Sequence, residues 1–147
     1  MPRHATSPTP DGHKQSVPVC PVITLQLSLP PTANHRLMPS GSGRRLILAP
    51  EYRQWQQAAH WQLRSQILPD IMDFMPLQQA LQLDIRVYFP DRRRHDLDNV
   101  LKGLQDLLVE EKIIADDSLI QQVTLSRAGI SRPGHAVLIL QVMAQAA

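Results

Sequence analysis

The sequence predicts an α+β domain in which a small mixed or antiparallel sheet of about four strands carries two main helices, in the order β–α–β–α–β–β. Two kinds of pattern predict these elements. Alternating apolar and polar residues at 22–29 and 83–89 are typical of half-buried strands. Apolar residues spaced three and four apart at 50–67 and 97–108 are typical of amphipathic helices.

The chain is long enough for one domain. Its 147 residues are 43% hydrophobic, which suffices for one core and is too little for two comfortable ones. We expect residues 21–147 to form this domain. Residues 1–20 are predicted to be a flexible extension, because prolines recur among Ser, Thr, His and Gly and too little apolar surface is available to offset the ordering entropy.

The first strand is expected at 22–29, where Pro30-Pro31 ends it. The polar segment 32–43 is expected to be a turn-rich loop, in which Asn34 and Arg36 are candidates for contact with a phosphate backbone. Pro50 is well placed to begin the first helix, which should end before Pro69. Its glutamines are expected to face solvent: Gln54, Gln56, Gln57, Gln62 and Gln66.

The later elements follow a second strand at 83–89. The helix at 97–108 comes next, and strands are then expected at 119–127 and 136–143, with a turn at 128–134 that contains Gly and Pro. No run approaches the roughly 18 apolar residues that a membrane span needs. One cysteine, Cys20, rules out an intramolecular disulfide and any Cys-rich zinc site, so we expect a soluble, cytoplasmic protein.

The segment 90–117, PDRRRHDLDNVLKGLQDLLVEEKIIADD, concentrates charge that is dilute elsewhere. Asp96 is a natural helix N-cap, Asp98 would lie in the first helical turn, and Lys102 follows four residues later. Each feature alone has a simple structural explanation, since caps, ion pairs four apart and solvated arginines are common. Their convergence favours a site that holds both an anion and a cation. Its candidate residues are Arg92, Arg93, Arg94, His95, Asp96, Asp98, Lys102, Asp116 and Asp117.

Carboxylates in this pattern suit magnesium, which binds through one or two carboxylates, water and the phosphate of a substrate. Asp96 and Asp98, with Asp117 from the entrance to the next strand, are expected to converge on such an ion. Arg92, Arg93 and Arg94 would then bind flanking phosphates. Zinc fits less well, because neither a cysteine set nor a spaced histidine pair accompanies the carboxylates.

The segment DRRRHDLDN, the lysine that follows it and the later DD pair closely resemble the RusA family of Holliday junction resolvases, as does the strand, PP and loop at 27–34. The resemblance covers most of 22–142. It implies a homodimeric, Mg²⁺-dependent endonuclease that makes paired nicks in four-way DNA junctions, serves DNA recombination and repair, and is often encoded by prophages; Mn²⁺ is the expected substitute. Matching positions imply a catalytic role for Asp96, Asp98, Asp117 and Lys102, with Asp116 beside them at the metal.

Two other functions also fit parts of the pattern. A non-catalytic, structure-selective DNA-binding protein would use the arginines alone, and a small interaction protein would use the acidic pairs only as caps. Aspartates among phosphate-binding arginines repel DNA unless a cation lies between them. The nuclease therefore explains more residues. His95 stands where the family often has a further arginine.

Overall fold

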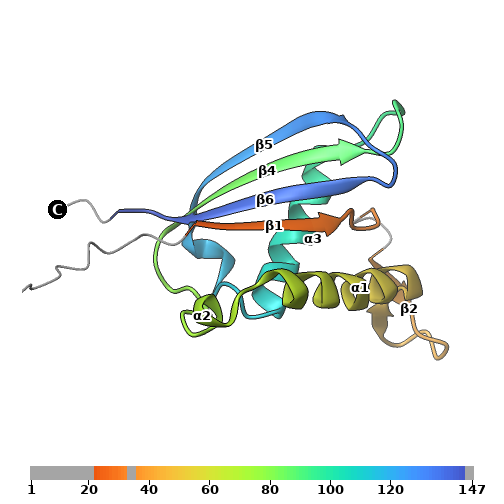
Figure 1. The fold of residues 1–147 in the computed structure, drawn as a ribbon. Coiled ribbons are helices and arrows are strands. Elements are labelled where there is room, and N and C mark those ends of the chain that lie inside the picture. Colours follow the sequence, from red (N-terminus) through yellow and green to blue (C-terminus); the bar gives the residue numbers. More distant parts are fainter. Residues whose placement is uncertain (1–21, 33–35, 145–147) are drawn as a thin grey trace, which may run out of the picture.

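The computed structural model describes residues 22–32 and 36–144, so the predicted extension at 1–20 lies outside the described residues. A four-stranded mixed sheet lies over two long helices, which cover one of its faces (Figure 1). This arrangement confirms the predicted α+β class. The elements are β1 (Val22–Ser28), β2 (Leu37–Pro39), β3 (Leu46–Leu48), α1 (Pro50–Gln66), α2 (Pro69–Met72), β4 (Leu81–Phe89), α3 (Leu97–Glu110), the 3-10 helix η2 (Asp117–Leu119), β5 (Ile120–Ile130) and β6 (His135–Val142).

The strand order of the sheet is β1-β6-β4-β5. β6 runs antiparallel to both of its neighbours, whereas β4 and β5 are parallel. Parallel neighbours need a crossover connection, and α3 supplies it. The charged segment at 90–96 therefore lies where the chain leaves β4, and Asp116 and Asp117 lie where it returns to begin β5.

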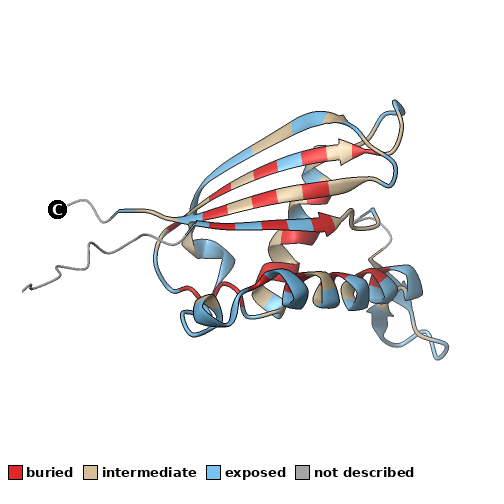
Figure 2. Cartoon of the chain, viewed as in Figure 1, coloured by how far each residue is buried: buried red, intermediate tan, exposed pale blue. Residues whose placement is uncertain are grey.

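The core lies between the sheet and the helices. On β1, the predicted alternation is confirmed, because Ile23, Leu25 and Leu27 are buried while their neighbours are exposed or half-buried. β4 and β6 alternate in the same way (Figure 2). Among the described residues no polar or charged residue is buried, so every polar side chain that a functional site could use is at least partly accessible to solvent.

The structure does not describe residues 33–35. Beyond them, the segment predicted to be a loop forms a β-hairpin. β2 and β3 pair antiparallel, with Leu37 opposite Leu48, Pro39 opposite Leu46 and a turn between the strands. Each strand is only three residues long, too short to produce a recognisable period of two. The apolar side chains of the hairpin remain largely exposed. The hairpin projects from the body of the molecule beside α1 (Figure 1).

The prediction that the glutamines of α1 face solvent is confirmed for Gln54, Gln57 and Gln66, whereas Gln56 and Gln62 are half-buried. Gln62 and Gln66 also bind the backbone of β1. Gln66 accepts a hydrogen bond from the Gln26 backbone N–H (2.7 Å) and donates one to the Gln26 carbonyl (2.7 Å). Gln62 accepts from the Ser28 backbone N–H (2.9 Å). Because β1 is an edge strand, its outward N–H and C=O groups need partners, and these side chains supply them. Among the described helices, none is long and apolar enough to cross a membrane.

Candidate active site

Asp91 organises the turn that follows β4. Its Oδ1 accepts hydrogen bonds from the Arg93 backbone N–H (2.9 Å) and from His95 Nε2 (2.7 Å). The bond from His95, followed by that from Arg93, holds the pKa of the Asp91 carboxyl below its usual value. The His95 ring also stacks on Phe89, with ring centroids 4.4 Å apart. The last residue of β4 thus supports the turn that presents the arginines.

Arg127 of β5 fastens the same turn from a neighbouring strand. Its Nη2 donates to the His95 carbonyl (2.9 Å), and its guanidinium lies 4.7 Å from the centre of the Phe89 ring. Sequence reasoning missed this residue, because it lies 32 positions beyond His95 and belongs to no local motif. Parallel pairing of β4 with β5 sets Arg127 opposite Val87, close to the end of β4. Only that pairing reveals the connection.

α3 begins as predicted, with Asp96 as its N-cap. The Asp96 side chain accepts a hydrogen bond from the Asp98 backbone N–H at 3.0 Å. Both carboxylates are exposed. The helix is pressed against the segment after β1 at Gly103, where an added Cβ would lie 2.9 Å from two atoms of Pro30. A side chain at this position would push α3, and the aspartates with it, away from the sheet.

Lys102 lies on the exposed side of α3, and its closest carboxylate is not that of Asp98. Its Nζ is 3.6 Å from Asp106 Oδ1, so the lysine pairs one turn toward the C-terminus. Asp106 also forms a short ion pair with Arg36, which in turn contacts Glu110 at 3.2 Å. The Arg36 guanidinium also lies over the Tyr52 ring, 5.1 Å from its centre. Lys102 therefore stands at the edge of a charge network that ties the start of β2 to α3.

Asp116 and Asp117 lie in the segment that leads into β5. Asp116 caps the 3-10 helix by accepting from the Ser118 backbone N–H (2.8 Å), and this bond is the largest cause of its lowered pKa. Asp117 is exposed. A cavity of about 290 Å³ is lined by both aspartates together with Arg36, Lys102, Asp106, Val109 and Glu110. The predicted lysine and the second acidic pair thus share one cavity.

The first acidic pair lines a different cavity, of about 500 Å³, formed by Arg94, His95, Asp96, Leu97, Asp98 and Arg127. In the described part of the chain no three His, Cys, Asp or Glu side chains gather closely enough to hold one metal ion. The structure instead presents two pairs of exposed carboxylates near opposite ends of α3. Each pair offers oxygen ligands only, which is the donor set that hard cations such as Mg²⁺ take in proteins.

The predicted DNA contacts divide into four groups. His95 is half-buried and is held by Asp91 and the Phe89 ring. Arg92, Arg93 and Arg94 are exposed, and no salt bridge found among residues 22–32 and 36–144 involves them. Arg36 is held by carboxylates and is only half-exposed, with a side-chain exposure of 25%. Asn34 lies outside the described residues. Among the predicted DNA contacts that the structure describes, the triplet is thus the part that is free to bind phosphate.

Comparison with known proteins identifies the family of the chain. The family model for "Endodeoxyribonuclease RusA" matches residues 28–139. A crossover junction endodeoxyribonuclease RusA of Aquifex aeolicus is 35% identical over 103 residues, which cover 69% of this chain and 76% of the relative. The protein of that name from Escherichia coli K12 is 26% identical, over 82% of this chain and 96% of the relative. The protein from Enterobacteria phage HK97 is 39% identical, but the match covers only 39% of this chain and 47% of the relative. The chain therefore belongs to the RusA family of endodeoxyribonucleases.

Proposed function

We propose that this protein resolves four-way DNA junctions by paired strand nicking and that it depends on a divalent cation. The observation that carries the proposal is a continuous turn in which exposed aspartates adjoin arginines that form no salt bridge within the described residues, in a chain of an endodeoxyribonuclease family. Arginines alone would suffice for binding to a phosphate backbone. The adjoining carboxylates disfavour DNA unless a cation accompanies it, so their presence supports hydrolysis rather than binding alone.

The proposed cation ligands are the carboxylates of Asp96 and Asp98 in one cavity and those of Asp116 and Asp117 in the other. Magnesium is the proposed ion, with Mn²⁺ as its substitute, because both take oxygen ligands. When bound, such an ion supplies Lewis acidity and neutralises charge that develops on the phosphodiester. Mg²⁺ needs only one or two carboxylates, so either acidic pair fits by its donor chemistry.

The protein's own cations have separate proposed roles. Lys102 has a side-chain exposure of 66% and lines the cavity with Asp116 and Asp117, so its ammonium can reach an oxygen of the reacting phosphate. Arg92, Arg93 and Arg94 bind flanking phosphates and fix the strand relative to the carboxylates. Correct placement of the strand is itself a large part of catalysis in phosphate chemistry.

We further propose that the active form is a homodimer of 21–147 domains. Resolution requires nicks in two opposed strands, and a two-fold dimer presents one site to each strand. On the sheet face away from the helices, Val137 and Ile139 of β6 are half-buried in the single chain. These apolar side chains are available to a partner subunit.

A cleavage assay tests the proposal. Purified protein is incubated with an end-labelled four-way junction or with a linear duplex of the same sequence, in Mg²⁺, in Mn²⁺ or in a chelator. We expect paired nicks in the junction with either metal, much weaker cutting of the duplex, and no cutting in the chelator. Binding of the junction without cleavage in either metal would identify a non-catalytic DNA-binding protein instead.

A further inference from the structure

The cavity beside Asp96 and Asp98 contains a second arginine that the charged turn does not supply. Arg127 reaches this cavity from β5, the strand that pairs in parallel with β4, whereas the turn follows the end of β4. Arg94, from the turn, also lines it. Two guanidinium groups from separate elements therefore border the space that holds the first acidic pair.

Arg127 is fixed in place yet retains most of its binding capacity. A guanidinium carries five N–H donors, and among the described residues Arg127 uses one of them, toward the His95 carbonyl. The stacking on Phe89 limits its rotation. Within the described chain no carboxylate forms a salt bridge with Arg127, whereas Arg36 has two such partners and Arg64 and Arg86 have one each. An exposed, held and uncompensated guanidinium is prepared for bidentate binding of an anion.

The charge of the cavity requires such a group. Asp96 and Asp98 are exposed at its border, and their carboxylates repel a DNA phosphate that approaches α3. Positive charge from the turn alone would attract the strand from one side. Arg127, on β5, lines the same cavity and adds positive charge from a second element.

We infer that Arg127 binds a backbone phosphate of the DNA and, with Arg94, clamps the strand across the cavity that contains Asp96 and Asp98. This inference rests on the proposed function and adds a DNA contact from outside the charged turn. The competing explanation is structural, because the hydrogen bond to His95 also holds the turn in shape. The two roles make different demands on the residue at this position.

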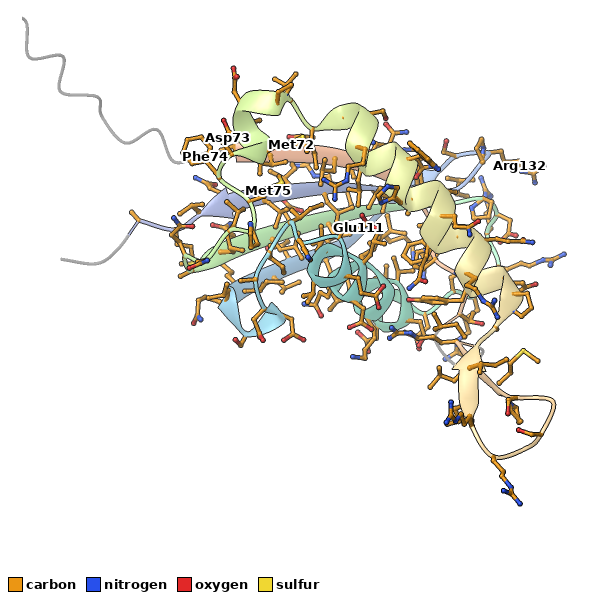
Figure 3. The ribbon with its side chains drawn as sticks, turned by 90° about the horizontal axis from the view of Figure 1, so that it is seen from below. Met72, Asp73, Phe74, Met75, Glu111 and Arg132 are labelled. Atoms are coloured by element: carbon orange, nitrogen blue, oxygen red, sulfur yellow. The ribbon has the colours of Figure 1, made fainter. Side chains whose placement is uncertain are left out.

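Two substitutions separate the roles. Arg127→Gln keeps an N–H donor for the His95 carbonyl but loses the charge, whereas Arg127→Lys keeps the charge. Arg132→Gln is the matched control, because Arg132 is also exposed and donates to the same turn, through Nε to the Pro90 carbonyl at 3.0 Å. Arg132 does not line the cavity. Figure 3 shows it at the end of the sheet opposite Met72, Phe74 and Met75.

Binding of a labelled four-way junction is measured by anisotropy in a chelator, which prevents cutting, from about 50 to about 200 mM salt. A lost phosphate contact lowers the slope of log K against log salt by about 0.9 per protomer. We expect this fall for Arg127→Gln, with roughly tenfold or greater weakening, as for loss of a charge-assisted hydrogen bond. Arg127→Lys should retain the slope, and Arg132→Gln should match the wild type. Arg93→Gln, within the triplet, gives the reference slope for one lost contact.

Two results would overturn the inference. In the first, Arg127→Gln has the same affinity and the same slope of log K against log salt as Arg132→Gln. In the second, Arg127→Lys and Arg127→Gln weaken binding equally and both keep the wild-type slope. The second result would assign Arg127 to support of the turn. Either outcome leaves the proposed function standing, provided that wild-type protein cuts the junction. Failure of the wild type to bind or cut any DNA would instead remove the proposed function itself.

Discussion

Asp91 is a carboxylate with a structural task beside a functional surface. It accepts from His95 and from the Arg93 backbone, and its lowered pKa shows that its charged form is favoured in the folded protein. A carboxyl whose pKa in the folded protein lies below its ordinary value of 3.8 stabilises the fold at pH values above 3.8. This stabilisation is lost as the pH falls through the folded pKa.

Asp91→Asn should therefore lower the thermal stability at pH 7, where wild-type Asp91 is ionised. The difference in Tm between wild type and variant should shrink below about pH 3.8, as the wild-type carboxyl becomes neutral. Thermal unfolding followed by circular dichroism at pH 7, 4 and 3 measures this. Asp70→Asn removes an exposed carboxylate of α2 that forms no salt bridge within the described residues; it is the control and should show a small difference at pH 7. An equal loss for Asp91→Asn at every pH would contradict the assignment.

Asp98→Asn tests the carboxylate proposed as a metal ligand. The amide keeps the shape of the side chain and loses the charge, so junction binding should persist. Nicking should fall at least about 100-fold, because a contribution of several kcal/mol to the transition state is removed. The helix itself should lose only about 0.3–1 kcal/mol from the missing first-turn charge. Single-turnover cleavage and binding in a chelator separate the two effects, and cutting at the wild-type rate would reduce Asp98 to a helix stabiliser.

At the scale of elements, α1 both covers the core and closes one edge of the sheet. Gln62 and Gln66 take the place of a further strand beside β1. The double variant Gln62→Ala, Gln66→Ala should lower the free energy of unfolding by about 3 kcal/mol, since it removes three hydrogen bonds to the β1 backbone and each contributes about 1 kcal/mol. Denaturant unfolding measures it.

The control for this change is Gln54→Ala, Gln57→Ala, at two exposed positions of the same helix. Alanine has slightly better helix propensity than glutamine, so the control should be neutral or slightly stabilising. If both double variants unfold at the same denaturant concentration, the glutamines do not protect the β1 edge.

The long elements were predictable from sequence, because burial on one side imposes a period that extends over many residues. β1 and α3 show this most clearly, down to the Asp96 N-cap. The hairpin of β2 and β3 was not predictable, since its short strands bury little and carry no such period. The partners of side chains were the least predictable. Lys102 pairs with Asp106 rather than Asp98, and both choices lie four residues away along the same helix.

At the scale of the whole molecule, the proposed dimer carries its own prediction. Sedimentation at micromolar concentration should give about twice the mass of the 16.6 kDa chain. Mixed dimers with one Asp98→Asn subunit should nick one strand of a junction without completing resolution. The reference is a mixture of two wild-type subunits with different tags. A monomer that still makes paired cuts would refute the dimer and leave the nuclease proposal intact.

The pairing of β1 with β6 also fixes where other molecules can be attached. Val22 pairs with Gln141, and Val142 pairs with Leu81 at the start of β4, so both flanks of the folded unit leave from one end of the sheet. The charged turn leaves from the other end, after Phe89. Along β4 the separation is about 27 Å, at about 3.3 Å per residue. A fluorophore or surface tether attached beside Val22 or Val142 would therefore hold the protein with its arginine turn facing away from the support.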